Sequence, residues 1–220
     1  MSTWSGTLQI KEQIQAYLND KAFETGGSKV DLLLKWANNI VNQITAEIDF
    51  RHLLIQEQRA ITTADWMWTV PANFQKRSKR FTKVRVGDDY IDEYTLEDLN
   101  ALDPNHSDTT TETKPSCWAL EGRTLHFYPL WAGTIVLENY YRYPTAMVND
   151  GASPDIPGTT SDTLVDDIII AGVLGRYGFP MLGEFDQATY WQNQYAEMFD
   201  TFKRDIRKTD THLKDVVIQY

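Results

Sequence analysis

Apolar positions recur with the period of an α-helix in several stretches of the chain. One stretch places them on a single face over about five turns, at Val30, Leu33, Leu34, Ala37, Ile40, Val41, Ile44 and Ile48. Near the C-terminus the same spacing returns at Phe185, Ala188, Gln192, Tyr195, Phe199, Phe202 and Ile206. The spacing predicts helices near residues 7–20, 29–50, 162–178 and 184–208, with Phe185, Tyr195, Phe199 and Phe202 in the core.

Between these helical parts the pattern becomes that of β-strands. The β-like segments are residues 53–63, 65–71, 80–86, 116–129 and 133–143, and the fourth of them reads as a hairpin that turns at Glu121-Gly122. Residues 95–102 favour one short helix, and residues 103–115 are polar and typical of a loop.

The order of these signals predicts an α+β protein that is mainly α. We expect a four-helix-type bundle from residues 1–52 and 160–208, with an antiparallel β subdomain inserted at 53–159 that carries the polar loop 103–115. Residues 209–220 form a separate C-terminal arm in this interpretation. The predicted end of the last helix lies near Ile206-Arg207, because "TDT" at 209–211 is unfavourable in a helix interior.

Composition narrows the possible functions. The 220 residues carry a formal net charge of −10, whereas proteins that bind nucleic acid unaided are usually basic. A single cysteine, Cys117, excludes an internal disulfide. The first residues do not resemble a signal peptide, and no stretch has the apolar length of a membrane span, so we expect synthesis in a cytoplasm.

Motifs for catalysis or for metal binding are weak. The sequence contains no P-loop, no nucleophile elbow and no zinc-binding pattern of His or Cys. Asp103, His106 and Asp108 lie close together, but in a polar loop that is poorly suited to hold ligands. Asp166 and Asp167 are better explained as favourable charges near a helix start. We expect no enzyme activity, no cofactor and no metal.

Two blocks of opposite charge are the strongest polar feature. Six basic residues and no acid occur at Lys76, Arg77, Lys79, Arg80, Lys83 and Arg85. Nine acids without Lys or Arg follow at Asp88, Asp89, Asp92, Glu93, Glu97, Asp98, Asp103, Asp108 and Glu112. They are either solvated faces that neutralise each other locally, or complementary surfaces for a head-to-tail contact between subunits.

A series of short motifs in a fixed order resembles the head–tail adaptor (head-completion, portal-connector) proteins of tailed bacteriophages. The series begins with "DFRHLL" at 49–54 and Trp68-Thr69-Val70-Pro71, followed by Ala72-Asn73-Phe74. It continues with "ALEGRTLHFYP" at 119–129, "YYRYP" at 140–144 and "DIP" at 155–157. The resemblance covers residues 30–208, and it departs from the family pattern at 88–115, which is longer and more acidic.

The resemblance implies a structural virion protein at the head–tail junction. Such adaptors form a ring, usually a dodecamer, that binds the portal protein on one side and a tail, stopper or nozzle protein on the other, while genomic DNA passes through the lumen. The implied subunit interface comprises Lys76, Arg77, Lys79, Arg80, Asp88, Asp89, Asp92 and Glu93. The alternatives are another tail-connector protein, a stopper or a terminator, and a carbohydrate-binding module suggested by the many aromatic residues.

The C-terminal segment is apolar where most chains are polar. Leu213, Val216, Val217, Ile218 and Tyr220 either pack on the subunit's own sheet or form an arm that orders on a partner. The resemblance favours the second interpretation, with the portal protein as the partner.

Overall fold

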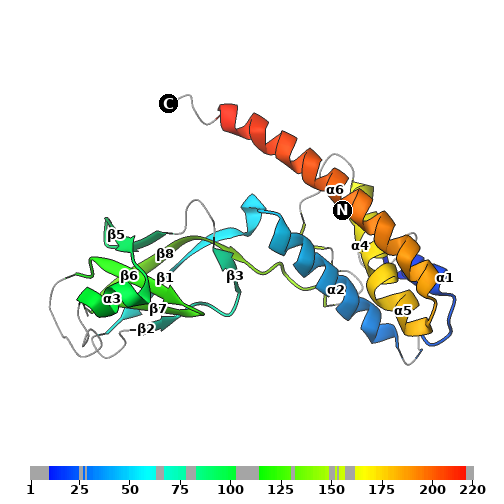
Figure 1. Ribbon diagram of the computed structural model, residues 1–220, viewed down its shortest axis with the longest axis horizontal. Coiled ribbons are helices and arrows are strands. Elements are labelled where there is room, and N and C mark those ends of the chain that lie inside the picture. Colours follow the sequence, from blue (N-terminus) through cyan, green and yellow to red (C-terminus); the bar gives the residue numbers. More distant parts are fainter. Residues whose placement is uncertain are drawn as a thin grey trace. The chain divides into compact units, whose positions relative to one another are not determined.

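The structure is a computed structural model in which the chain forms two compact units. It describes residues 10–24, 27, 29–62, 67–77, 83–102, 114–129, 132–148, 152, 154–156 and 162–216. Residues Met1–Phe50 and Pro144–Tyr220 belong to a helical unit, and Arg51–Tyr143 form a sheet unit (Figure 1). The chain therefore leaves the helical unit once and returns to it once.

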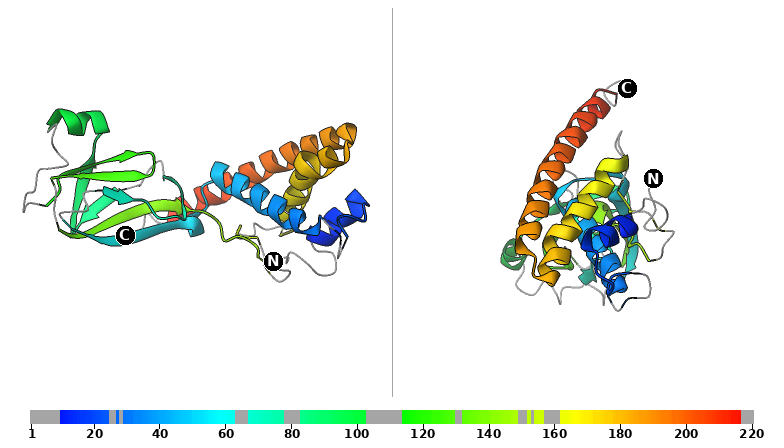
Figure 2. Two further views of the ribbon diagram at one scale, coloured as in Figure 1. Left: turned by 90° about the horizontal axis from the view of Figure 1, so that it is seen from below. Right: turned by 90° about the vertical axis from the view of Figure 1, so that its right-hand side faces the viewer.

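The helical unit contains every helix that the periodicity predicts. Its elements are α1 (Ile10–Leu18), α2 (Val30–Glu47), α4 (Asp162–Val173), a π-helical segment (Leu174–Gly178), α5 (Phe179–Leu182) and α6 (Phe185–Val216). Helix α4 packs against α1, α2 and α6, and the views in Figure 2 place it beside α2 and α6. Residues Ile168 to Leu174, at the end of α4 and the start of the π-helical segment, are apolar on nearly all sides. This part of the chain can therefore be covered by several neighbouring helices.

Two glycines let the helices approach closely. A Cβ atom on Gly172 would lie 2.9 Å from Ile40 Cδ1 of α2, and one on Gly175 would lie 2.7 Å from the backbone nitrogen of Gln192 in α6. At Gly175 the atom met belongs to the backbone and cannot rotate away, whereas at Gly172 the side chain of Ile40 would have to shift. Glycine at these positions therefore determines how tightly α4 and the π-helical segment pack on α2 and α6.

The segment after the sheet folds onto the helical unit. Asn38 of α2 forms a pair of hydrogen bonds with the backbone of Met147, with its amide donating to the carbonyl oxygen and its Oδ1 accepting from the N–H, both at 2.9 Å. The N–H of Thr145 donates to Asp155 at 2.7 Å, and Met147 and Ile156 are buried. Residues 144–159, which the sequence analysis placed in the β subdomain, thus fall in the helical unit.

The sheet unit contains a short 3₁₀ turn, eight described strands and one helix. The strands are β1 (Leu54–Ile61), β2 (Met67–Thr69), β3 (Phe74–Arg77), β4 (Lys83–Val86), β5 (Asp89–Glu93), β6 (Cys117–Glu121), β7 (Thr124–Tyr128) and β8 (Gly133–Arg142), and the helix is α3 (Leu96–Leu102). Their order in the sheet is β1-β8-β4-β5-β6-β7-β2, and β3 also pairs with β8. Strands β5 and β6 run parallel, and the other pairs are antiparallel.

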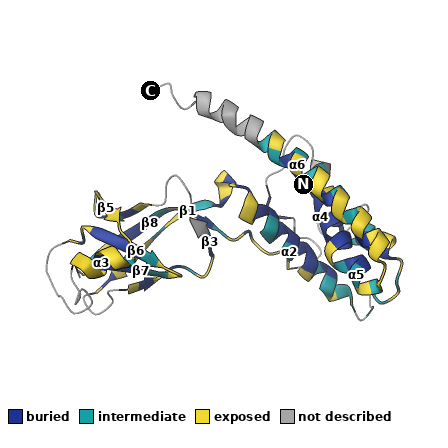
Figure 3. Ribbon diagram, viewed as in Figure 1, coloured by how far each residue is buried: buried dark blue, intermediate teal, exposed yellow. Residues whose placement is uncertain are grey.

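The sheet curls around its own core. Ile61 at one end of the strand order and Trp68 at the other belong to the same buried cluster, together with Trp118, Phe127 and Tyr140. On the opposite face of β6, Cys117 and Ala119 pack against Leu99 of α3. Figure 3 shows buried residues on the strands of this sheet beside exposed ones, and exposed residues on α3 and β5. The sheet is therefore a unit with a core of its own.

The expected fold, a mainly α protein built on a four-helix bundle with an antiparallel insertion, is wrong. The inserted segment Arg51–Tyr143 is an eight-stranded sheet with a core of its own, so the protein is not mainly α, and the β5–β6 pair of this sheet is parallel. The sequence pattern missed β3 and β5, because both are short and strongly polar. Strand pairing joins residues far apart in the chain, and local periodicity carries no information about it.

Candidate assembly surfaces

Four acids of the acidic block lie on one exposed hairpin. Strands β4 and β5 turn at Gly87, whose φ of 64° favours glycine. The four acids that follow form what we call the acidic hairpin surface, and all are exposed: Asp88, Asp89, Asp92 and Glu93. Asp88 lies 3.8 Å from Arg85, and Asp89 lies 3.5 Å from Lys114. Within the described part of the chain, Asp92 makes no ion pair.

The basic block is described only in part. Lys76 and Arg77 are in β3, where their backbones pair with Tyr141 and Tyr140, while Lys79 and Arg80 lie outside the described residues. Arg85 donates to Glu138 at 3.1 Å and also faces Asp88. The two charge blocks thus neutralise each other locally at Arg85, and a contact of the other basic residues with a neighbouring subunit stays a prediction.

The predicted C-terminal arm, residues 209–220, begins within helix α6. Helix α6 continues to Val216, so its predicted end near Arg207 is wrong. The Thr and Asp residues at 209–211 lower helix propensity by less than about 1 kcal/mol each, and no Pro or Gly follows Gly183 to interrupt the helix. Of the residues assigned to the arm, Leu213 and Val216 are in α6, while Val217, Ile218 and Tyr220 lie outside the described residues. The three residues weighed as metal ligands, Asp103, His106 and Asp108, also lie outside the described residues.

An exposed aromatic surface occurs where the sequence predicted core. Tyr195, Phe199 and Phe202 are buried as predicted, but 69% of Phe185 is exposed. Phe185 is the first residue of α6, and three other apolar residues of the helical unit are exposed as well, Tyr17, Met181 and Tyr190. Trp191 joins this group, since its ring lies 4.8 Å from that of Tyr17 and 5.5 Å from that of Tyr190. Exposed aromatics grouped in this way are typical of protein–protein contact sites.

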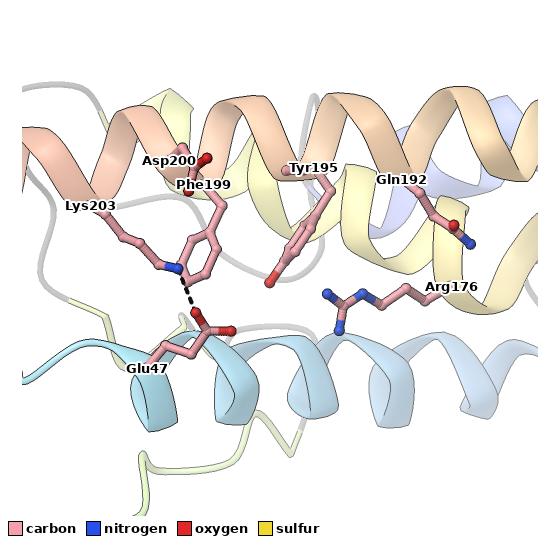
Figure 4. A pocket seen from close by; sticks show the side chains of 8 residues that line it. Glu47, Arg176, Gln192, Tyr195, Phe199, Asp200 and Lys203 are labelled. Carbon is pink, nitrogen blue, oxygen red and sulfur yellow. Dashed lines mark hydrogen bonds and ion pairs between the residues drawn. The ribbon is translucent and has the colours of Figure 1, made fainter.

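A second feature of the helical unit is an open cavity of about 320 Å³ between α2, the π-helical segment and α6. Its lining residues are Glu47, Arg176, Gln192, Tyr195, Ala196, Phe199, Asp200 and Lys203 (Figure 4). The ammonium of Lys203 pairs with Glu47 at 2.5 Å and lies 4.1 Å from the centre of the Phe199 ring. The guanidinium of Arg176 lies 4.5 Å from the centre of the Tyr195 ring and donates to Gln43.

Burial and neighbouring charges raise the pKa of three side chains, Tyr195 at the cavity and Cys117 and Tyr140 in the sheet unit. Burial raises the pKa of Tyr195, an effect that Arg176 opposes and Glu47 reinforces. Burial likewise raises the pKa of Cys117, which is packed in β6 and is therefore a poor nucleophile near neutral pH. The hydroxyl of Tyr140 lies 3.0 Å from Glu57 Oε2, and burial followed by this contact raises the pKa of Tyr140. All three side chains are thus kept uncharged.

Two further observations concern the described ranges as a whole. No three Asp, Glu, His or Cys side chains among the described residues are grouped so that they could hold a metal ion. Among the helices that the structure describes, none has the length and hydropathy to cross a membrane.

The comparisons with known proteins give one result. No curated protein matches the chain. The family described as SU10 adaptor protein matches residues 7–214, which include both units of the structure and the candidate surfaces described above. The match also agrees with the ordered motifs at 49–54, 68–74, 119–129 and 140–157. The chain therefore belongs to the SU10 adaptor protein family, a family of structural adaptors from the head–tail junction of phages.

Proposed function

We propose that the protein forms a ring beneath the portal protein of a DNA-filled capsid and joins the portal to a tail, stopper or nozzle protein. The family match over residues 7–214 carries this proposal. The structure supports it with chemically different surfaces on the same chain, the acidic hairpin surface in the sheet unit and the aromatic surface in the helical unit. A subunit with unlike contact surfaces is suited to head-to-tail association, which closes into a ring.

The contact between neighbouring subunits is electrostatic in part. We assign its acidic side to Asp88, Asp89, Asp92 and Glu93, and its basic side to the block that contains Lys76, Arg77, Lys79 and Arg80. Opposite charges of this kind orient the subunits as they approach and select the correct neighbour. The end of α6 with residues 217–220 provides the arm for the portal protein, where an apolar segment can order in a groove.

The charge of the assembly suits the passage of DNA. Twelve copies at −10 each would give a ring a charge of about −120. DNA binds proteins largely through phosphates neutralised by Lys and Arg, so walls of net negative charge would let DNA slide without being held. Assembly in the virion after synthesis in the host cytoplasm completes this proposal.

The test uses portal-containing heads that lack the protein. Wild-type protein added to such heads should attach as a ring visible by electron cryomicroscopy, and the symmetry of the ring gives its stoichiometry. Protein with Arg77→Glu and Arg80→Glu should stay folded and fail to form rings, and deletion of residues 209–220 should leave a folded protein that no longer attaches. Attachment of wild-type protein as single subunits, or to tails but not to heads, would refute the proposed function.

A further inference from the structure

Two hydrogen-bond donors line the cavity between α2, the π-helical segment and α6, the Tyr195 hydroxyl and the Arg176 guanidinium. Among the described residues, neither of them is bonded to a carboxylate. Tyr195 is 4% exposed, and its hydroxyl is buried without a hydrogen-bond partner among the described residues. Arg176 is exposed and donates only to the neutral amide oxygen of Gln43. No carboxylate of the described part of the chain lies within ion-pair distance of Arg176.

Packing holds these two donors in place. The Tyr195 ring stacks on Phe199 with centroids 5.5 Å apart, and the Arg176 guanidinium lies 4.5 Å from the centre of the Tyr195 ring. Gly172 and Gly175 permit the close approach of α4 and the π-helical segment that brings Arg176 to α6. Figure 4 shows the Arg176 and Tyr195 side chains reaching toward each other across the cavity. The hydroxyl therefore cannot turn to water without disrupting a stacked pair.

An unsatisfied hydroxyl is costly. A buried donor without a partner destabilises a protein by about 1–3 kcal/mol, so most such groups find an acceptor in the state in which the protein functions. Glu47 lines the cavity together with Tyr195, but its carboxylate pairs with Lys203 at 2.5 Å. The geometry of the free subunit thus leaves one cation and one hydroxyl available to the same acceptor.

We propose that this cavity is a carboxylate-binding site, filled in the assembled ring by Asp92 of a second copy of the chain. A carboxylate can accept from a guanidinium and a hydroxyl at once, and hydrogen bonds to a charged acceptor are the strong ones. Glu47 already balances the charge of Lys203, so Arg176 is the one cation left among the described lining residues, and a single negative charge suits the cavity better than a phosphate group.

Asp92 is the chosen occupant because no described residue of its own subunit pairs with it. Of the acidic hairpin surface, Asp88 and Asp89 have basic neighbours in the same chain, whereas exposed Asp92 makes no ion pair among the described residues. Asp92 and Arg176 belong to different units of the chain, so a contact between them joins unlike surfaces of two copies, as in a head-to-tail association. This inference rests on the proposed ring and gives Asp92 a partner of its own within it, while Asp88, Asp89 and Glu93 keep the contact with the basic block.

Charge exchange on portal-containing heads tests the contact. Arg176→Glu and Asp92→Arg should each raise the protein concentration needed for ring formation by about tenfold or more, because each places like charges at the contact. The double variant, Arg176→Glu with Asp92→Arg, restores an opposite pair and should form rings within about threefold of the wild-type concentration. Lys35→Glu is the matched control, since Lys35 is an exposed lysine of α2, and this change should have little effect.

Tyr195→Phe separates binding from folding. The change removes only the hydroxyl, for which the described part of the chain offers no partner, so the free protein should be as stable as wild type or more stable. Ring formation should nevertheless require about threefold more protein, because the carboxylate loses one donor.

The possible outcomes distinguish this inference from the proposed function. If wild-type protein forms rings and Arg176→Glu does so equally well, or if the double variant is no better than the single ones, the carboxylate site is refuted and the ring stands. A loss of stability in Tyr195→Phe would also refute it, because the hydroxyl would then be bonded in the free subunit. If wild-type protein forms no ring on the heads, the proposed function itself fails.

Discussion

Replacing Gly175 by alanine tests the packing of the helical unit most directly. The added Cβ would lie 2.7 Å from the backbone nitrogen of Gln192 and 3.0 Å from the backbone carbonyl carbon of Trp191. Ordinary contacts begin at 3.4 Å, so α6 would have to move outward by about 0.7 Å. Backbone atoms cannot rotate away as a side chain can, and the strain therefore falls on the contact between α6 and the π-helical segment.

The magnitude follows from three contributions to the free energy of unfolding. Overpacking of this kind costs about 1–3 kcal/mol. Displacement of α6 also stretches the bond from Gln192 Nε2 to the carbonyl oxygen of Gly175, which is 2.9 Å long, and a lost hydrogen bond costs about 1 kcal/mol. Alanine has a better helix propensity than glycine, and this offsets up to about 1 kcal/mol of the loss in stability. The net loss should be about 1–3 kcal/mol.

Hydrogen exchange of the amides of α4 and α6 measures this loss, because a chain of two units need not unfold in a single transition. Gly172→Ala is the matched control. Its added Cβ would meet only side-chain atoms of Ile40 and Tyr195, and these can shift, so its loss should be smaller. Equal protection in Gly175→Ala and wild type would refute the close contact between α6 and the π-helical segment.

Two further predictions concern stability. Phe199→Ala should lower the stability of the helical unit by about 3–5 kcal/mol, because Phe199 is only 4% exposed. Phe185→Ala should change it by less than about 0.5 kcal/mol, because Phe185 is 69% exposed. Urea unfolding monitored by hydrogen exchange measures both changes, and equal losses would contradict the difference in burial. The second concerns α3, where Thr95 and Asp98 cap the helix reciprocally and these hydrogen bonds hold the pKa of Asp98 below its ordinary value. A lowered pKa contributes stability above the unfolded pKa of about 3.9 that is lost as the pH falls through the folded pKa. Thr95→Ala should therefore weaken the protection of the α3 amides from hydrogen exchange at pH 7. The protection that remains should also change less as the pH is lowered than it does in wild type. An unchanged pH profile would refute the capping contact.

The sequence by itself determined the local elements of this protein. Helices α1, α2, α4 and α6 follow from an apolar spacing near 3.6 residues, and so does the burial of Tyr195, Phe199 and Phe202. Alternation and turn residues likewise predicted the hairpin of β6 and β7 around Gly122. The family was also recognisable from sequence, since its motifs are short, local and ordered.

Only the tertiary structure decided which of these elements pack together and what they leave exposed. Phe185 occupies a position of the same stripe as Phe199, but it begins α6 and is not covered, so a predicted core residue became part of an exposed aromatic surface. The parallel pairing of β5 with β6 and the size of the sheet depend on residues far apart in the chain. The meeting of Arg176 with Tyr195 depends on glycines that let two helices approach. Burial, strand pairing and close approach are properties of pairs of elements, whereas periodicity describes one element at a time, and for this reason the sequence pattern could not supply them.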